Sequence, residues 1–484
     1  MYIIGIIGFG IVGSAGLKFF IERPQAFRSF FGLPSEAAIR FIVWDQKECL
    51  PEDVMLLEAH KVIWQTQSQC SLPEFLACVD RALVSPGVSL LGIDSKLRAK
   101  TFCELDLFAH RAQGKTIGIT GSLGKTTVTK LIYQILSRFH ALQEGRKRIA
   151  LGGNVGIGML DLLRAPLPAA WSVLELSSFQ LENSHIFAPS VGVWTNLHPN
   201  HLDRHTDMEG YFKAKSNLFE LQGAEDYLIL GRQLFDEEVA PFTLALLKKT
   251  SARLVIAGIK PLEADVISFI PRAEWSLWTL ANGQLYKYTI RNGAIAHMIS
   301  VIAVRDLPLC TFAQNWAVIF AALEAAGVDL DWLVQDLKAN VAFYQPDDHK
   351  HRVEFVREVN GIAFYNDSKS TVKESTIAAA QQLSLTYKRV HVMIGGVGKG
   401  VDRRDFAQRL GTFSSVASII AFGKEAGSLG AQLCVATVEE ALKEVLAIAQ
   451  AGDAVLFSPG GASFDLFKHY IQRGDCFKEL VTAL

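Results

Sequence analysis

A glycine-flanked turn followed by lysine and threonine is the stretch of this chain best suited to chemistry. It reads Thr-Gly-Ser-Leu-Gly-Lys-Thr-Thr over residues 120–127. Gly121 and Gly124 allow backbone N–H groups to curl around phosphate oxygens. Lys125 supplies a positive charge for the β- and γ-phosphates, and the Thr126 hydroxyl can ligate Mg²⁺. The pattern predicts a nucleoside triphosphate site, although Ile119 stands where the usual pattern has glycine.

Further chemically capable side chains follow this loop. Glu175 ends an apolar strand, where a carboxylate can hold Mg²⁺ or its water shell. His201 lies in a run of imidazoles without zinc spacing, so assistance to a phosphate–Mg²⁺ cluster is the better hypothesis. Asn154 lies in a glycine-rich turn, and turn formation explains it equally well. Lys215, taken alone, reads as a solvated helix lysine.

A third group of polar residues lies near the C-terminal third of the chain. The Arg352 guanidinium suits bidentate phosphate binding. Asp367 and Lys369 are two residues apart and share a face if extended. There Asp367 could receive a ribose and Lys369 an anionic substrate group, with surface ion pairing as an equal alternative. Together with the triphosphate loop, these residues suit an enzyme that activates one substrate with ATP and joins it to another.

The N-terminus carries a second glycine pattern. Gly8–Gly13 has the spacing G-x-G-x-x-G after the predicted strand 2–7, and Asp45 follows a second strand at 38–43. Asp45 lies later than the spacing of about 20 residues typical of dinucleotide sites. The pattern therefore favours a nucleotide-like ligand without redox chemistry, and an NAD-dependent oxidoreductase stays open as an alternative.

Alternating apolar strands and helical patterns must position these groups. The predicted central strands cover 116–120, 170–174 and 190–195, with a helix opening at Lys125, and further strands cover 253–257, 266–269, 275–280 and 285–290. The C-terminal strands cover 353–356, 362–365, 390–394, 417–422 and 454–457, and one more N-terminal strand covers 81–84. This order predicts an α/β protein with mostly parallel sheets. Its expected parts are a Rossmann-like domain (1–112), a central P-loop domain (113–346) and a C-terminal Rossmann-like domain (347–484).

Composition excludes several classes of protein. Apolar residues make up 50% and charged residues 20% of 484 residues, which indicates large buried cores. A net charge of −1 gives no electrostatic footprint for nucleic acid or an anionic membrane. Seven scattered cysteines indicate reduced, mostly buried thiols in a cytoplasmic protein. Residues 1–17 are uncharged but glycine-rich, and Lys18 interrupts them, so we expect no targeting segment or membrane span.

Taken in order, the motifs resemble the Mur ligase family across nearly the whole chain. The matching runs are residues 120–127, 152–156, 175–181, 201–204, 214–215, 351–354, 366–371, 395–399 and 458–464. Ile119 is then expected, since the family loop is Thr-Gly-x-x-Gly-Lys-[Ser/Thr]. The run Glu-Leu-Ser-Ser-Phe-Gln at 175–180 is typical of the family's D-glutamate-adding branch.

The resemblance implies three domains, of which the first holds the UDP end of a substrate, the second binds ATP and the third closes on both. It also implies an ATP-dependent, ADP-forming ligase that joins D-glutamate to UDP-N-acetylmuramoyl-L-alanine through an acyl phosphate. Such an enzyme would be a cytoplasmic monomer in peptidoglycan biosynthesis, which serves cell shape and cell division. ATP and two Mg²⁺ ions would be its cofactors.

The resemblance further assigns roles by position. The catalytic residues would be Lys125, Glu175, His201 and Lys215, and the metal ligands Thr126, Glu175, His201 and a carbamylated Lys215. ATP would contact Gly121, Ser122, Leu123, Gly124, Lys125, Thr126, Thr127, Asn315, Arg352 and Asp367. The UDP substrate would contact Val12, Gly13, Ser14, Asp45, Ser85, Pro86, Gly87, Asn154 and Ser177. D-Glutamate would contact Lys369, Thr371, Lys399, Ser463, Phe464 and Tyr470.

Several positions depart from the family pattern. Val372 and Val397 replace residues near the amino-acid site, and Thr311 and Phe312 replace the usual His-Asn before Asn315. These departures loosen the expected adenine and amino-acid contacts and leave the phosphate and metal groups intact. Another specificity within the family, or a catalytically weakened homologue that binds a nucleotide sugar, therefore stays an alternative.

Overall fold

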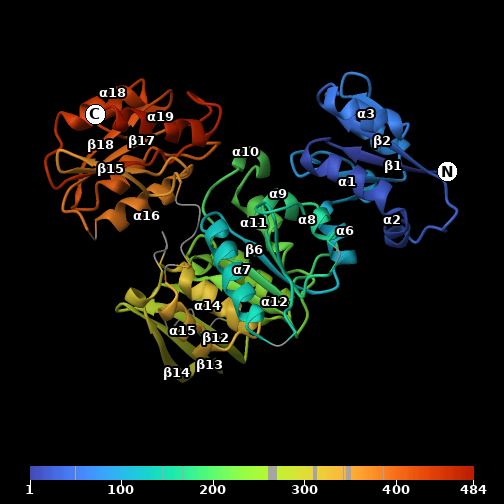
Figure 1. Ribbon diagram of the computed structural model, residues 1–484, viewed down its shortest axis with the longest axis horizontal. Helices are drawn as coiled ribbons and strands as arrows, with labels where there is room; N and C mark the ends of the chain where they lie inside the picture. The colour runs from blue at the N-terminus through green and yellow to red at the C-terminus, as the bar shows by residue number, and fades with distance from the viewer. Residues whose placement is uncertain are drawn as a thin grey trace. The chain divides into compact units, whose positions relative to one another are not determined.

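The computed structural model describes residues 1–49, 51–143, 145–165, 167–259, 267, 270–308, 313–341, 343–344, 350–384 and 386–484. One compact unit comprises Met1–Leu197, Glu209–Leu307 and Gln314–Asn340, and the other His198–Met208, Pro308–Ala313 and Val341–Leu484. Helices alternate with strands over much of both units (Figure 1), and most strand pairs are parallel, which confirms the predicted α/β class. The boundary at 112/113 stays a prediction, and that at 346/347 lies outside the described residues.

The N-terminal sheet has the strand order β3-β2-β1-β4-β5, and every pair in it is parallel. Its strands are β1 (Tyr2–Ile7), β2 (Ile39–Asp45), β3 (Ile63–Thr66), β4 (Arg81–Val84) and β5 (Thr101–Phe102). The helices are α1 (Ile11–Glu22), α2 (Pro24–Phe31), α3 (Pro51–Ala59), α4 (Leu72–Cys78), α5 (Ser95–Arg98) and α6 (Glu104–Arg111). Ile4, Ile6 and Ile7 are fully buried because helices cover both faces, which explains the unbroken apolar run of β1. The predicted strands at 2–7 and 81–84 are confirmed.

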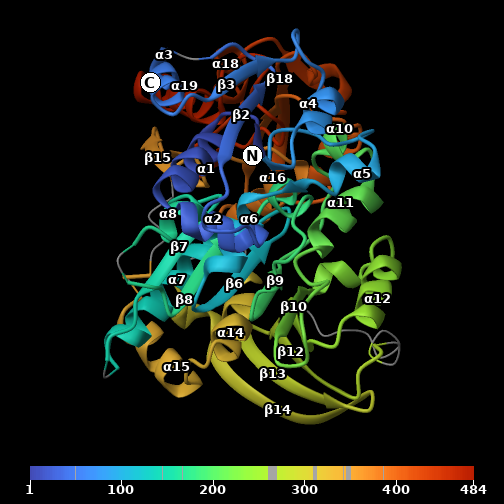
Figure 2. The same ribbon diagram turned by 90° about the vertical axis from the view of Figure 1, so that its right-hand side faces the viewer.

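The central sheet has the order β14-β13-β12-β11-β10-β9-β6-β8-β7. Its strands are β6 (Lys115–Thr120), β7 (Ile149–Gly153), β8 (Trp171–Glu175), β9 (Val191–Trp194), β10 (Tyr227–Gly231), β11 (Arg253–Ile259), β12 (Glu274–Ala281), β13 (Gln284–Arg291) and β14 (Ala294–Ala303). Figure 2 shows β12, β13 and β14 side by side, where antiparallel pairing extends the parallel sheet. The described part of residues 221–310, which had no predicted role, thus supplies five of the nine strands of this sheet. The strand predicted at 266–269 lies outside the described residues except for residue 267.

Helix α7 (Lys125–Ala141) begins at the residue that the sequence predicted. Its buried positions include Val128, Leu131, Ile132 and Ile135, the apolar face expected from helical spacing. That face packs on β7 and β8 and against α14 (Asn315–Ala325). The other helices of this part are α8 (Met159–Leu162), α9 (Ser178–Leu181), α11 (Met208–Ser216), α12 (Ala240–Lys249) and α15 (Leu330–Ala339).

The second unit contains a six-stranded sheet of order β15-β16-β20-β17-β18-β19 within its described residues. The strands are β15 (Glu354–Val359), β16 (Ile362–Asn366), β17 (Val390–Gly395), β18 (Val416–Phe422), β19 (Leu433–Val435) and β20 (Ala454–Phe457). Its helices are α10 (Leu202–His205), α16 (Lys373–Leu383), α17 (Phe406–Leu410), α18 (Val438–Leu446) and α19 (Tyr470–Thr482). Two apolar clusters, one containing Phe406 and the other Phe477, form the core of this unit.

The cysteine prediction needs a correction. The six described cysteines are free thiols, but only Cys103 among them is buried, while Cys78 and Cys434 are exposed. Cys78 is the last residue of α4 and Cys434 lies in the short edge strand β19, so both are close to solvent. In the described part of the chain, no helix has the length and apolar character needed to cross a membrane.

Candidate active site

The triphosphate loop runs from the end of β6 to the start of α7 and has the geometry of a phosphate cradle. Gly121 has φ +147° and Gly124 has φ +80°, values that side-chain-bearing residues rarely adopt. Lys125 Nζ donates to the carbonyl oxygens of Gly121 (2.9 Å) and Ser122 (3.3 Å), so its charge lies over the loop. Leu123 and Thr126 are half-buried beside it, and Thr127 is buried. The predicted loop residues therefore come together at a helix N-terminus, where phosphate binds favourably.

Residues at the carboxyl end of β9 hold the loop in place, and the sequence analysis had not assigned them a role. Asn196 Oδ1 accepts from the Leu123 N–H (2.8 Å), and Asn196 Nδ2 donates to the Leu123 carbonyl (3.1 Å). Thr195 Oγ1 donates to the same carbonyl (2.6 Å). Both residues directly follow a buried strand of the same sheet as the loop. Because the carboxyl ends of parallel strands meet at one edge of a sheet, this position could have predicted their contact with the loop.

Glu175 is the buried acid of this region, with 2% of its surface exposed. Its Oε1 accepts from Asn154 Nδ2 at 3.1 Å. Its Oε2 is buried and has no hydrogen-bond partner within the described residues. An ionised carboxylate oxygen buried without a partner is costly unless a cation or donor joins it. The residues therefore fit a bound divalent cation, with oxygen ligands from Glu175 and the Thr126 hydroxyl.

Lys215 is not the solvated lysine that its helix alone suggested. Only 1% of it is exposed, and Nζ donates to Thr120 Oγ1 (3.3 Å) and to the Gly121 carbonyl (3.1 Å). Nζ also lies 4.7 Å from the ring centroid of Tyr211, one turn earlier in α11. Burial, and then the charge of Lys125, lower the pKa of Lys215 well below its usual value, against the opposing influence of Glu175. The neutral amine is a competent nucleophile.

Tyr211 links this lysine to the loop, a role that the sequence analysis missed. Its hydroxyl lies 3.2 Å from Ser122 Oγ, and burial raises its pKa to about 12. The four-residue spacing of Tyr211 and Lys215 on one helix was the signal that could have found it.

A cavity of about 350 Å³ adjoins the loop. Asn315 and Thr195 line it, and both approach the loop glycines: an added Cβ at Gly124 would meet Asn315 Oδ1 at 2.8 Å. Other residues that line the cavity lie at the carboxyl ends of β10 and β11, among them Arg232, Gln233 and Gly258. A hollow of this size beside a phosphate cradle can hold a nucleoside. Asn315 thus lines a hollow beside the loop, and its contact with ATP stays a prediction.

The predicted UDP residues of the N-terminal sheet gather at the carboxyl ends of β1, β2 and β4. Asp45 Oδ2 accepts from the Phe9 N–H (2.6 Å), and Ser85 Oγ donates to the Gly8 carbonyl (2.6 Å). A Cβ at Gly13 would lie 2.1 Å from that carbonyl oxygen, so the turn requires glycine. Val12 and Ser14 lie in the first turn of α1, and Pro86 and Gly87 lie in the turn after β4. Asp45 and Ser85 therefore shape the turn, and their contact with a ligand stays a prediction.

Ser177 also has a structural role beside its predicted substrate contact. It caps α9, accepting from the Gln180 N–H (3.2 Å) and donating to Gln180 Oε1 (2.9 Å). This reciprocal pair is a capping box, which fixes the turn directly after Glu175.

In the second unit, Asp367 and Lys369 do not lie on one face of an extended strand, because β16 ends at Asn366 and a turn follows. Asp367 is 3% exposed; its Oδ2 accepts from Ser370 (2.6 Å) and Ser458 (2.5 Å), and its Oδ1 accepts from the Val353 N–H (3.2 Å). Burial raises the pKa of Asp367 to about 6, while these donors and the Arg352 charge oppose the rise. Arg352 and Asp367 are thus neighbours, as their shared predicted role requires.

The predicted amino-acid residues of this unit come from neighbouring loops. Lys369 Nζ lies 5.7 Å from the ring centroid of Tyr470, the first residue of α19. Val397 and Ala462 exchange backbone hydrogen bonds (2.7 and 2.8 Å), which joins the loop of Lys399 to that of Ser463 and Phe464. Ser463 is buried, Phe464 is 72% exposed and Thr371 is half-buried. The backbone bridge needs no particular side chain at 397, so Val397 is compatible with it.

The structure thus brings together Lys125, Glu175 and Lys215 in the first unit. His201, at φ +56° before α10, belongs to the second unit, and its predicted metal contact stays a prediction. Thr311 and Phe312 lie outside the described residues.

Comparison with known proteins agrees with this architecture. The Mur ligase middle domain matches residues 119–286, and the Mur ligase, glutamate ligase domain matches residues 351–461. A UDP-N-acetylmuramoylalanine–D-glutamate ligase of Solibacter usitatus is 33% identical over 391 residues, covering 79% of this chain and 78% of that protein. The protein of the same name from Acidobacterium capsulatum is 32% identical over 433 residues, covering 84% and 82%.

Among solved structures, MurF from Acinetobacter baumannii shares the fold with a TM-score of 0.57 and 18% identity, over 94% of this chain and 98% of that one. The family and relative matches, not the fold alone, make the chain an ATP-dependent ligase. The chain belongs to the Mur ligase family.

Proposed function

We propose that this enzyme joins D-glutamate to UDP-N-acetylmuramoyl-L-alanine with conversion of ATP to ADP and phosphate. The observation that carries the proposal is the buried cluster of Lys125, Glu175 and Lys215 at the triphosphate loop, where one Glu175 oxygen lacks a partner within the described residues. The specificity is supported by the run 175–180 and by the names of the relatives. The reaction would be a cytoplasmic step of peptidoglycan synthesis.

The first half of the reaction is phosphoryl transfer. A carboxylate is a poor acyl donor at neutral pH, and phosphorylation of the alanyl carboxylate converts one oxygen into a good leaving group. Lys125 and the loop N–H groups hold the β- and γ-phosphates and stabilise the charge that develops during transfer. Thr126, Glu175 and His201 would hold Mg²⁺, which when bound would offset the charge on the transferring phosphoryl group.

The second half is amide formation. The amine of D-glutamate attacks the acyl carbon, the C–O bond to phosphate breaks, and the amine loses a proton. Lys369, Lys399 and Ser463 would hold the two carboxylates of D-glutamate, since ammonium groups and a hydroxyl suit these anions. Arg352 and Asp367 would contact ATP from the second unit.

Lys215 would act as a carbamate. Its neutral amine adds to CO₂, forming an N–C bond and releasing one proton, and the product carries a negative charge. That charge would neighbour Lys125 and provide an oxygen ligand for the second Mg²⁺. Within the described residues, Lys215 Nζ donates to a hydroxyl and a carbonyl oxygen and to no carboxylate. Protonation of this buried amine is therefore unfavourable.

A matrix of amino acids against UDP-muramoyl precursors, read by phosphate release, tests the proposal. We expect release only when UDP-N-acetylmuramoyl-L-alanine and D-glutamate are both present. Release with L-glutamate or a diamino acid would assign another specificity within the family, and no release with any pair would indicate a nucleotide-sugar-binding homologue. Tight NAD binding at the Gly8–Gly13 turn would instead revive the oxidoreductase alternative.

The matched variants are Glu175→Gln and Glu209→Gln. The first removes the buried charge while nearly keeping the shape, and we expect a loss of kcat of about 100-fold or more. The second changes an exposed acid of α11 and should leave kcat unchanged.

A further inference from the structure

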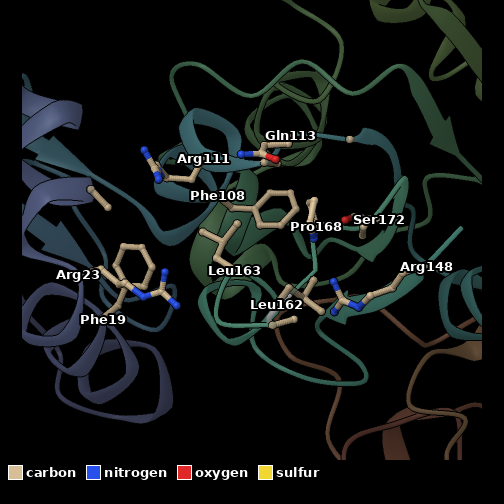
Figure 3. A pocket seen from close by; sticks show the side chains of 15 residues that line it. Phe19, Arg23, Phe108, Arg111, Gln113, Arg148, Leu162, Leu163, Pro168 and Ser172 are labelled. Carbon is tan, nitrogen blue, oxygen red and sulfur yellow. The ribbon is translucent and has the colours of Figure 1, made fainter.

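A second cavity of the first unit lies apart from the triphosphate loop and has a volume of about 220 Å³. Figure 3 shows its lining. Phe19 and Arg23 come from the end of α1 and the residue after it, Phe108 and Arg111 from α6, and Arg148 from the residue before β7. The cavity therefore lies where the N-terminal sheet's helices meet the central sheet.

This cavity is separate from the ligase site on geometric grounds. Helix α1 has 12 residues and begins at the predicted UDP turn, so its far end, at the cavity, lies about 18 Å away. Ser172, in the cavity wall, is at the amino end of β8, whereas Glu175 is at its carboxyl end. Gly114, also in the wall, precedes β6, whose other end leads into the triphosphate loop. The cavity thus lies at the amino edge of the central sheet, opposite the edge where such sheets bind their substrates.

Three guanidinium groups line this cavity without a counter-charge. Within the described residues, Arg23, Arg111 and Arg148 form no ion pair, and no acidic residue is among those lining the cavity. The neighbouring acids Glu22 and Asp161 both bind Arg164, each at 2.9 Å. Arg148 is oriented by donating to the Leu167 carbonyl at 2.9 Å. Like charges held around one hollow repel each other, and an anion in the hollow would remove that cost.

The wall of the cavity is mostly polar, and nearly buried apolar side chains lie behind it. Phe19, Phe108 and Leu162 are 3%, 1% and 6% exposed. In Figure 3, Phe108 and Leu163 lie between Arg23 on one side and Arg148 on the other. A ligand that reaches the guanidinium groups on both sides has acidic groups at its two ends. The volume is below the roughly 300–1,000 Å³ of sites for drug-sized molecules, so the ligand is small.

We propose that this cavity binds a small organic dianion, such as a dicarboxylate, at a site distinct from those of ATP and the UDP substrate. Arginine suits such a ligand because its planar fork binds a carboxylate in a bidentate manner. The bound dianion contacts α1 and α6 together with the loop before β8, and so fastens these elements to one another.

Isothermal titration calorimetry of the full chain with terephthalate and with adipate tests the site, with terephthalamide as the neutral analogue and inorganic phosphate as the simple anion. We expect saturable binding of at least one dicarboxylate with a Kd of about 1 mM or below, and weaker binding of phosphate and terephthalamide by about tenfold or more. Absence of saturable dicarboxylate binding would overturn the proposal, as would equal binding of phosphate.

The informative variant is Arg23→Ala combined with Arg111→Ala. Both side chains are exposed, so the fold should be kept, which a thermal unfolding curve like that of the wild type verifies. Dicarboxylate binding should weaken at least about tenfold. Arg305→Ala, which removes a side chain that is 89% exposed elsewhere in the same unit, is the control and should bind like the wild type. Equal binding by the double variant, or displacement of the dicarboxylate by ATP or the UDP substrate, would contradict a separate arginine site.

Discussion

At the level of single residues, Lys215 offers the sharpest contrast between a sequence pattern and its surroundings. Helical spacing alone suggests a solvated lysine, yet the side chain is fully buried beside Lys125 and Glu175 and has a strongly lowered pKa. No local pattern contains this information, because the burial comes from β6 and the loop, which are about 90 residues away in sequence. Only the resemblance to a family gave the residue a role in the site, and that role stays a prediction.

We therefore expect Lys215→Ala to lower kcat by about 100-fold or more, because the variant has no amine to form a carbamate that neighbours the loop. Short carboxylic acids should restore part of the activity by supplying the missing carboxylate, as measured by phosphate release. Lys213→Ala, on the exposed side of the same helix, is the control and should keep full activity. Full activity of Lys215→Ala, or its failure to respond to any short acid, would contradict the carbamate role.

Asp367 allows a prediction about pH. Its pKa is about 6 in the folded protein against 3.8 ordinarily, so between these values the native state binds more protons than the unfolded state. The unfolding free energy consequently falls as pH rises through this window, by about 3 kcal/mol from this group. The Asp367→Asn variant should lack this fall in unfolding free energy. The unfolding free energies of wild type and variant, measured by denaturant titration, should therefore converge or cross between pH 4 and 7. Asp331→Asn, at an exposed position, should run parallel to the wild type, and a parallel Asp367→Asn curve would refute the raised pKa.

At the scale of elements, the sequence predicted most strands whose apolar runs are continuous, such as β1, β4 and β8, together with the start of α7. It did not predict β3, β5, β7, β10, β14 or β19. Strand β14 is mostly exposed along its length and lacks the continuous burial that identifies a core strand, and β19 has only three residues. For the site, motif residues were placed correctly near the loop, while Thr195, Asn196 and Tyr211 were missed. These residues act through hydrogen bonds to a segment about 70–90 residues away, which spacing cannot reveal.

The hydrogen bonds between Asn196, which follows β9, and the triphosphate loop allow a further prediction. Asn196→Ala removes two hydrogen bonds to Leu123, each worth about 1 kcal/mol, so the loop should lose part of its fixed geometry. We expect the KM for ATP to rise about tenfold with a smaller change in kcat. Asn282→Gly, in an exposed turn at φ +49°, is the matched control and should not change either constant. A selective fall in kcat without a change in KM would instead mean that Asn196 acts in the chemical step.

At the scale of the whole molecule, the residues predicted to hold the UDP end and those of the triphosphate loop lie on different sheets. The first set follows β1, β2 and β4, and the loop follows β6. Binding at the two sheets should therefore be separable by mutation.

Lys125→Ala should weaken the binding of a non-hydrolysable ATP analogue by about tenfold or more, and should bind the UDP-muramoyl substrate as the wild type does. Gly13→Ala should do the reverse, because the added methyl group would lie 2.1 Å from the Gly8 carbonyl oxygen and open the turn held by Ser85. Calorimetric titration of both variants with both ligands distinguishes the outcomes, with a melting curve to verify that Gly13→Ala is folded. If either substitution weakens both ligands equally, the two sites are not independent, and the assignment of the UDP end to the N-terminal sheet is wrong.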